Sequence, residues 1–244
     1  MNIPDRALGW KYDLPAPGVP SHLEKTATHA VPSPNHIDEA YIEVPRSTFR
    51  IRGYWTVGGS ILLLAGFIML IFFTYLDLAS TAKVDLESTA IIASSFALAF
   101  ALTIPYIRMD IGHPRDQPIR FNRHRRKVYF YQYRFDRLNP FGHKNWGVKP
   151  VAYDWDDLTA EVYSIYAPLG YGGLLENVMI SVRKPGTDEV IDRVFFTSDI
   201  EQGKQYWAIT RLFMQQGAEA LPDFVYPPTD WNSEDLGSVR KVLS

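Results

Sequence analysis

The sequence predicts a membrane α-helical hairpin joined to an antiparallel α+β domain. Two long apolar runs lie between residues 57 and 107, short alternating segments with turn signals follow them, and one amphipathic segment comes near the C-terminus. The first pattern is typical of membrane helices, and the other two are typical of a sheet covered by a helix.

The two apolar runs have the length of transmembrane helices. Val57–Leu76 contains 20 residues and Thr89–Ile107 contains 19, with no Asp, Glu, Lys, Arg or His in either run. A helix rises about 1.5 Å per residue, so each run can cross a hydrocarbon core of roughly 30 Å. Two buried helices of a soluble domain are the alternative, but such helices usually carry a polar stripe, and these runs do not.

The charges beside the two runs predict their orientation. Basic residues precede the first run and follow the second, whereas the link Asp77–Ser88 carries one lysine and three acidic residues. Positive charge is retained on the cytoplasmic side of a membrane. We therefore expect a multi-pass protein with both termini in the cytoplasm and the link outside.

Small residues in both runs predict the faces on which the helices pack. Glycine, alanine and serine let helix backbones approach closely in a membrane, and a short link requires antiparallel packing. Pro105 predicts a kink or an early end of the second helix. The expected contact residues are Gly58, Gly59, Gly66, Ser94, Ala97 and Ala101.

Composition divides the chain into four segments. Residues 1–44 are rich in proline and are expected to be largely extended or disordered, with local docking of Trp10, Tyr12 and Leu14 onto the folded part. Residues 45–111 are expected to form the hairpin. Residues 112–221 are long enough for a cytoplasmic domain with its own core, and residues 222–244 are expected to be a mobile tail. The formal net charge of -2 gives no reason to expect a nucleic-acid partner.

Alternating segments predict six or so antiparallel strands after the second run. A basic turn, Arg123–Arg126, separates two of them, and Pro185 with Gly186 is a turn signal between two others. An earlier segment, Tyr41–Arg52, is expected to be a strand or to lie at the membrane interface. The strand segments after the second run are Pro118–Asn122, Lys127–Tyr133, Val151–Tyr153 leading into Trp155–Leu158, Thr159–Tyr166, Val178–Arg183 and Val190–Thr197.

One amphipathic helix is predicted after the strands. Ser198 with Glu201 three residues later forms a capping-box pattern, and Pro222 is expected to end the helix. Its apolar face consists of Tyr206, Ile209, Phe213, Gly217 and Ala220. Successive strands closed by one C-terminal helix are typical of a pleckstrin-homology-like β-barrel, with an α+β sheet covered on one face as the alternative.

The sequence shows no catalytic constellation, so we expect no enzymatic activity, no cofactor and no metal. Cysteine is absent, there is no G-x-S-x-G motif, and the histidines lie singly in different segments. Asp154, Asp156 and Asp157 are expected to form a solvated acidic turn.

Basic residues are concentrated in a stretch after the second run. This stretch either only sets the orientation of the helices in the membrane or also forms a surface that attracts anionic lipid headgroups. Base stacking is the weaker alternative, because the interleaved aromatic residues fit strand alternation better. The membrane-surface candidates are Arg115, Arg120, Arg123, Arg125, Arg126 and Lys127.

Three segments resemble a known group of sequences. These are Phe49–Gly53, Pro118–Arg123 followed by Arg126–Tyr129, and Asp154–Asp156. Over about residues 41–221 the chain resembles a family of uncharacterised proteobacterial two-span membrane proteins that accompany type VI secretion effectors. The resemblance implies a bacterial inner-membrane protein with an immunity or accessory role, and it supplies no catalytic residues.

We therefore expect a non-enzymatic immunity-like protein that binds and neutralises a cognate toxin. The alternative is a membrane-tethered module that binds anionic lipid or a cytosolic partner. Membrane lipids are expected partners in both cases, and the sequence does not indicate an oligomeric state. Candidate partner anchors on loops are Arg137, Trp146 and Tyr171.

Overall fold

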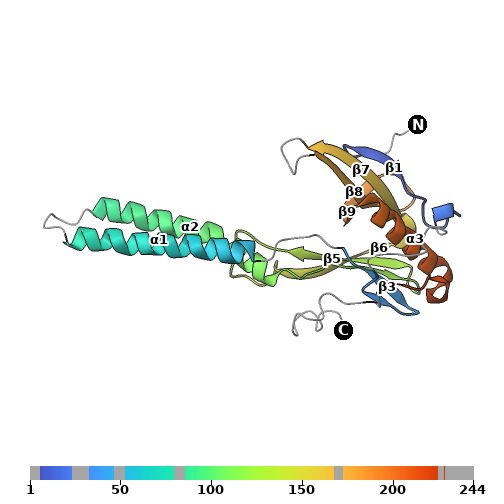
Figure 1. Ribbon diagram of the computed structural model, residues 1–244, viewed down its shortest axis with the longest axis horizontal. Coiled ribbons are helices and arrows are strands. Elements are labelled where there is room, and N and C mark those ends of the chain that lie inside the picture. Colours follow the sequence, from blue (N-terminus) through green and yellow to red (C-terminus); the bar gives the residue numbers. More distant parts are fainter. Residues whose placement is uncertain are drawn as a thin grey trace. The chain divides into compact units, whose positions relative to one another are not determined.

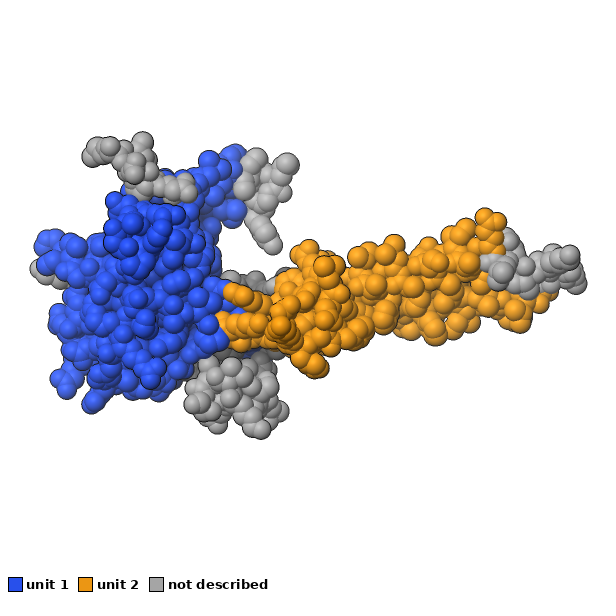
Figure 2. Space-filling model, turned by 180° about the vertical axis from the view of Figure 1, so that it is seen from behind, with its two compact units in different colours: residues 1–48, 114–132, 150–244 blue, residues 49–113, 133–149 orange. Residues whose placement is uncertain are grey.

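The computed structural model describes residues 6–23, 33–46, 53–79, 86–167, 173–224 and 228. The chain forms two compact units, which Figures 1 and 2 show. Unit 1 comprises residues 1–48, 114–132 and 150–244, and unit 2 comprises residues 49–113 and 133–149. The structure therefore assigns residues 133–149 to the helical unit, whereas the sequence predicts them within the soluble domain. Most of the predicted tail lies outside the described residues.

Two long helices make up most of unit 2, as predicted. Helix α1 spans Tyr54–Ala79 and helix α2 spans Leu86–Gly112, and both are long and apolar enough to cross a membrane. Helix α2 continues through Pro105, so the early end predicted there is wrong. It ends just before His113, where the following Pro114 disfavours helical backbone.

The two helices pack antiparallel along a seam in which glycines of α1 face larger side chains of α2. A Cβ at Gly59 would lie 2.9 Å from Thr103 Cγ2, and a Cβ at Gly66 would lie 3.1 Å from Phe96 Cδ2. The less exposed positions recur at spacings of three and four residues, as in a coiled coil. They are Thr56, Gly59, Leu63, Gly66 and Leu70 on α1, and Ile92, Phe96, Ala99 and Thr103 on α2.

Four of the predicted contact residues lie off this seam. A Cβ at Gly58 would have no neighbour within 4 Å. Ser94, Ala97 and Ala101 are exposed on α2. Because the glycines of α1 already provide the gaps, α2 fills them with larger side chains, and its small residues are left on the outer face.

An aspartate closes the polar end of the hairpin. Asp110, in the last turn of α2, accepts hydrogen bonds from Thr56 N at 2.9 Å and from Thr56 Oγ1 at 2.8 Å. The carboxylate thereby satisfies an amide at the N-terminus of α1, where a negative charge is also favoured by the helix dipole. Beside it, Trp55 stacks on Tyr106 with ring centroids 4.9 Å apart. These contacts fix the register of the two helices.

Unit 1 contains a five-stranded antiparallel sheet in the order β2-β3-β4-β5-β6. The predicted hairpin with a basic turn is confirmed as β4 and β5, in which Phe121 pairs with Val128. Strand β3 pairs with β4 and places Val44 opposite Ile119. The strands are β2 (His36–Ile37), β3 (Tyr41–Val44), β4 (Ile119–Asn122), β5 (Lys127–Arg134) and β6 (Gly147–Asp154).

A second antiparallel sheet has the order β1-β7-β8-β9. The predicted turn at Pro185 and Gly186 joins β8 to β9, and Gly186 has a φ of 74° there. The strands are β1 (Trp10–Asp13), β7 (Leu158–Ala167), β8 (Gly173–Arg183) and β9 (Val190–Thr197). Both sheets are open, so the predicted closed barrel is wrong, while two antiparallel sheets with a C-terminal helix are present.

Helix α3 spans Ile200–Gln216 and confirms the predicted C-terminal helix. Its N-cap is Asp199, whose side chain accepts from Gln202 N at 2.7 Å, so the predicted cap at Ser198 is wrong by one residue. The helix ends before Gly217, which has a φ of 102°, and not at Pro222. Glycine at this position terminates the helix because it adopts positive φ without strain.

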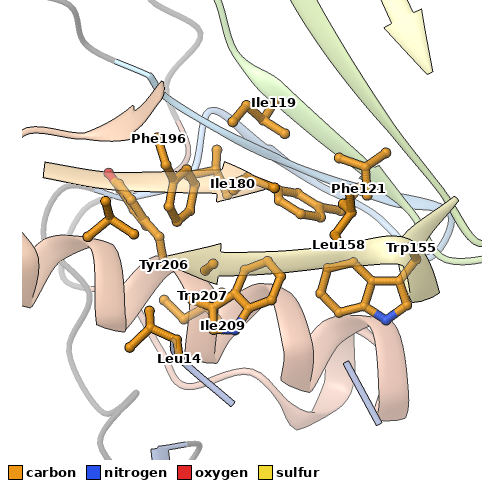
Figure 3. Close-up of a cluster of buried hydrophobic side chains, with 14 of the residues drawn as sticks. Leu14, Ile119, Phe121, Trp155, Leu158, Ile180, Phe196, Tyr206, Trp207 and Ile209 are labelled. Atoms are coloured by element: carbon orange, nitrogen blue, oxygen red, sulfur yellow. The ribbon is translucent and has the colours of Figure 1, made fainter. Parts of the chain in front are cut away.

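The core of unit 1 lies where the inner faces of both sheets meet α3, as Figure 3 shows. Trp155, in a 3₁₀ helix at Trp155–Asp157, packs edge-to-face on Phe121 at 5.8 Å and tilted on Trp207 at 5.1 Å. It therefore joins the five-stranded sheet to α3. Gly203 lets α3 approach β8, because a Cβ there would lie 2.5 Å from Val178 Cγ2.

The described part of the N-terminal segment is structured, contrary to the prediction of disorder. It supplies β1, β2 and β3 to the two sheets. Leu14 is buried in the core, and the Pro15 carbonyl accepts a hydrogen bond from Trp207 Nε1 at 2.8 Å. The prolines exclude helix but permit edge strands and extended segments, and these pair with strands from later in the chain.

A buried carboxylate joins the segment before the hairpin to the segment after it. Asp116 accepts from Asn35 Nδ2 at 2.7 Å and from Arg46 N at 2.9 Å, and Arg46 Nη2 donates to the Tyr131 carbonyl at 3.0 Å. Burial raises the pKa of the Asp116 carboxyl, although the hydrogen bonds from Asn35 and Arg46 act in the opposite direction. We call Asp116 with Asn35 and Arg46 the junction cluster.

The hairpin seam predicts different effects for two adjacent glycines. We expect Gly59→Leu to lower the free energy of unfolding by about 1–3 kcal/mol, because the new side chain overlaps Thr103 and Ile107. Gly58→Leu is the matched control and should not lower the free energy of unfolding, because a side chain at Gly58 meets no neighbour. Both variants have the same gain in helix propensity, so this gain cancels in the comparison. Denaturation of the full-length protein in detergent micelles measures the difference, followed by the part of the tryptophan fluorescence that Trp55→Phe removes. An equal decrease in the free energy of unfolding for the two variants would contradict the packing of Gly59 against α2.

Candidate functional site

The outer face of the five-stranded sheet collects tyrosines and arginines. Strand alternation turns Ile42, Phe121 and Val128 into the core, which leaves their neighbours on the opposite face. These neighbours surround a shallow hollow of about 300 Å³. We call this surface the Tyr–Arg face; its lining residues are Tyr41, Arg120, Asn122, Arg125, Tyr129 and Tyr131.

Arg120 is fixed in place at the centre of the Tyr–Arg face. Its guanidinium carbon lies 4.3 Å from the centroid of the Tyr41 ring and 5.5 Å from that of Tyr131. Arg120 Nη2 also lies 3.0 Å from Glu43 Oε2. Cation–π contact and a partly buried ion pair together hold the side chain in one orientation.

The electrostatics of the face depend on this arginine. Burial alone would lower the pKa of Arg120, but the Glu43 carboxylate and the hydroxyls of Tyr131 and Tyr41 offset it, so the pKa lies above its ordinary value. Burial raises the pKa of the Tyr131 hydroxyl, which therefore remains a neutral hydrogen-bond donor at physiological pH. The face offers phenol rings, a fixed arginine that is paired with Glu43, and the exposed Arg125, which suit contact with a polar or acidic surface.

The basic turn beside this face is paired with acidic residues. Arg126 Nη2 lies 2.5 Å from Asp156 Oδ1, and Lys127 Nζ lies 2.8 Å from Asp154 Oδ1. The hydrogen bond to Asp154 raises the pKa of Lys127. The sequence predicts a solvated acidic turn, and Asp154 and Asp156 are indeed exposed, but each forms an ion pair with a basic side chain that the sequence did not predict. Arg126 and Lys127 therefore carry less uncompensated charge than the sequence suggests.

The remaining membrane-surface candidates have separate environments. Arg123 is half-buried at the end of α3, where its Nη1 would lie 2.8 Å from a Cβ at Gly217. A cation is favoured at this C-terminal end of a helix. Arg125 is exposed at the rim of the Tyr–Arg face, and Arg115 is exposed after α2. Among the six candidates, only Arg120 and Arg125 line the hollow.

The predicted partner anchors do not form one surface. Trp146 is half-buried in unit 2, where its Nε1 donates to the Asn139 carbonyl at 2.9 Å and its ring lies under Arg108 at 4.3 Å. Arg137 is exposed and lies over the Tyr106 ring at 5.4 Å. Tyr171 lies outside the described residues. The two described anchors thus belong to the helical unit and not to a loop of the soluble domain.

Sequence reasoning missed Tyr41 and Glu43 as neighbours of Arg120. The signal was available, because Tyr41–Val44 and Ile119–Asn122 both alternate and could have been paired as neighbouring strands. The ion pairs of the basic turn also had a signal in the sequence. Asp154 and Asp156 are separated by one residue, and they pair with the adjacent basic residues Lys127 and Arg126. Among the residues that the structure describes, no group of three or more His, Asp or Glu side chains could hold a metal ion.

The comparisons with known proteins give one family match. A family described as "Family of unknown function (DUF6708)" matches residues 96–244, which begin in the middle of α2 and include strands β4 to β9 and helix α3. No curated protein and no solved structure matches the chain. The expected membership of an uncharacterised family is confirmed at this level.

The geometry predicts different roles for the two arginines of the Tyr–Arg face. We expect Arg120→Ala to lower the free energy of unfolding by about 1–3 kcal/mol, because the buried Glu43 carboxylate loses its ion pair. Arg125→Ala should change it by less than about 0.5 kcal/mol, because that side chain is exposed. Thermal unfolding of the full-length protein in detergent compares the two. A loss for Arg125→Ala as large as that for Arg120→Ala would contradict this assignment.

Proposed function

We propose that this chain, which belongs to the family of unknown function DUF6708, is a membrane-anchored, non-enzymatic binding protein. In this proposal the α1–α2 hairpin lies in a bilayer, and unit 1 binds a protein partner through the Tyr–Arg face.

The observation that carries the proposal is the exposure of the hairpin. Only 6 % of the apolar segment of α1 and 11 % of that of α2 are buried. The core helices of a soluble protein would bury much more apolar surface than this. Leaving it in water is unfavourable by about 25 cal/mol per Å². A bilayer removes that penalty, and it requires no polar stripe on either helix.

The polar end of unit 2 supports one orientation. Trp55 and Tyr106 lie at the end of the apolar segments, where aromatic side chains are enriched at membrane interfaces. The basic residues beyond them in the described part of unit 2 are Arg108, Arg134, Arg137, Lys144 and Lys149. Positive charge at this end favours a cytoplasmic location, so we place both termini in the cytoplasm and the protein in a bacterial inner membrane.

The Tyr–Arg face supports a protein partner over a lipid. Tyrosine and arginine dominate the residues that contribute most to binding at protein interfaces. Arg126 and Lys127, which would serve best to attract anionic lipid, are already paired with Asp156 and Asp154. Binding of anionic lipid or a cytosolic partner by unit 1 is therefore the weaker alternative.

Two finer assignments belong to the same proposal. A pleckstrin-homology-like fold is supported by two antiparallel sheets packed with a C-terminal helix, although here strands before the hairpin complete both sheets. An immunity role against a type VI secretion effector rests on the resemblance of Pro118–Arg123 and its neighbouring segments to effector-associated membrane proteins.

Reporter fusions test the membrane location. Alkaline phosphatase should be active when fused in the link after Ala82 and inactive when fused after Ser244, with fluorescent protein fusions giving the reverse. Leu64→Asp and Leu98→Asp change residues that are 60 % and 61 % exposed, so they should be harmless in a soluble protein. In a bilayer each should oppose insertion by about 2.5–3.5 kcal/mol. Unchanged yield of both variants in the soluble fraction would overturn the membrane location.

Growth rescue tests the partner. The test takes a toxin gene that neighbours this gene in a genome: expression of that toxin should stop growth, and co-expression of the full chain should restore it. Arg125→Glu combined with Tyr129→Ala should abolish rescue at an unchanged membrane level, because each hot-spot residue changes affinity about tenfold or more. Lys184→Glu, an exposed basic residue in the β8–β9 turn, is the control and should rescue. If the unaltered chain does not reduce killing by the toxin, the immunity role is excluded. The proposed membrane location would be unaffected by that result.

A further inference from the structure

A groove lies on unit 2 between the end of α2 and the segment Pro140–Gly147. Its volume is about 770 Å³, within the range of roughly 300–1,000 Å³ found for small-ligand sites. It is lined entirely by residues of unit 2. None of these residues belongs to the Tyr–Arg face.

One wall of the groove continues the apolar surface of the hairpin. Ile104, Ile107 and Ile111 recur along one side of α2, and Pro140 and Phe141 line the groove across from them. Ile111 is 63 % exposed and Phe141 is 73 % exposed. Such a strip of exposed aliphatic and aromatic side chains is suited to contact with an acyl chain.

The other end of the groove carries positive charge. Arg108 follows the apolar run directly, donates through Nη1 to the Pro140 carbonyl and lies over the Trp146 ring at 4.3 Å. A guanidinium has five N–H donors, so it can also bind a phosphate while it keeps these contacts. His143 lines the same groove, and Lys144 follows it in the chain.

We propose that this groove binds one anionic phospholipid, with an acyl chain along Ile104, Ile107 and Ile111 and the phosphate at Arg108. The inference rests on the proposed insertion of the hairpin, because that places Arg108 at the depth of the headgroups. Charge selects this occupant: the segment 133–149 has four basic residues and one acidic residue. A protein segment is the competing occupant, but continuity of the groove with the membrane-facing surface favours lipid.

Quenching of Trp146 tests the site in the full-length protein. The protein is reconstituted into vesicles of phosphatidylcholine that contain 5 mol % of a lipid with brominated acyl chains, either phosphatidylglycerol or phosphatidylcholine. Bromine quenches tryptophan only at short range, so random lipid contact gives equal quenching with the two lipids. Occupation of the groove gives additional quenching with phosphatidylglycerol, and Trp146→Phe should abolish this difference.

Matched variants assign the difference to the groove. Arg108→Gln should lower the apparent affinity for phosphatidylglycerol about fivefold, whereas Arg137→Gln should not change it. Ile111→Asp, which adds a carboxylate to the groove, should also remove the difference. Leu138→Asp is its control, because Leu138 is 96 % exposed and does not line the groove.

The outcomes separate this inference from the proposed function. Comparison with Trp55→Phe gives the part of the fluorescence due to Trp55, one of six tryptophans. If vesicles made wholly of brominated phosphatidylcholine fail to quench that part, the hairpin is not inserted and both proposals fail. If that part is quenched but the two lipids at 5 mol % quench Trp146 equally, the groove takes unselected lipid or a protein segment. That result, or an effect of Arg137→Gln equal to that of Arg108→Gln, would overturn the lipid site alone.

Discussion

The structure depends on the pairing of β3 with β4, which are neighbours in one sheet although the whole helical hairpin lies between them in the chain. Val44 pairs with Ile119, so the hairpin is in effect an elaborate connection between two antiparallel strands. The second excursion, residues 133–149, joins β5 to β6 at the same end of the sheet, because successive antiparallel strands alternate in direction. Bringing the two ends of so long a connection together lowers the conformational entropy of the chain. Buried hydrogen bonds help to offset this cost. The junction cluster does this at the sheet, where Asp116 accepts from Asn35 and Arg46, and Asp110 does it at the hairpin, where it accepts from Thr56.

This arrangement gives the basic residues around the hairpin different tasks. Arg46 is buried and donates to the Tyr131 carbonyl, so it stabilises the connection itself. Arg126 is balanced by an exposed ion pair, which contributes little to stability. Arg125 remains at the rim of the Tyr–Arg face, and Arg108 remains in the groove of unit 2. In the sequence these basic residues all flank the two apolar runs, but folding assigns some of them to structural contacts and leaves others exposed to a binding partner.

Local patterns predicted the elements well and their partners poorly. The apolar runs, the basic turn before Lys127 and the turn at Pro185 and Gly186 are local signals, and each led to the element that the structure shows. Strand β1 was missed because Trp10–Asp13 is short and lies among prolines, and its place in the sheet depends on long-range pairing with β7. The same limit applies to the candidate site: Arg120 and Arg125 were predicted, but Tyr41 and Glu43 come from a strand that precedes the hairpin. Their approach depends on long-range pairing, which periodicity does not encode.

The shape of the Tyr–Arg face decides which class of partner it suits. A hollow of about 300 Å³ is at the lower limit for a small-molecule site, so it would bury little of a ligand's surface. A protein partner needs no deep pocket, because it gains from a broad contact with a few fixed anchors. Arg120 is already held by the Tyr41 ring and by Glu43, so little side-chain entropy remains to be lost when a partner binds. The proposed anchoring in a membrane would further reduce the affinity required, because a partner at the same membrane would meet the face at a high effective concentration. Under the proposed function, a preorganised, shallow surface would therefore suffice for recognition of a partner that acts at the same membrane.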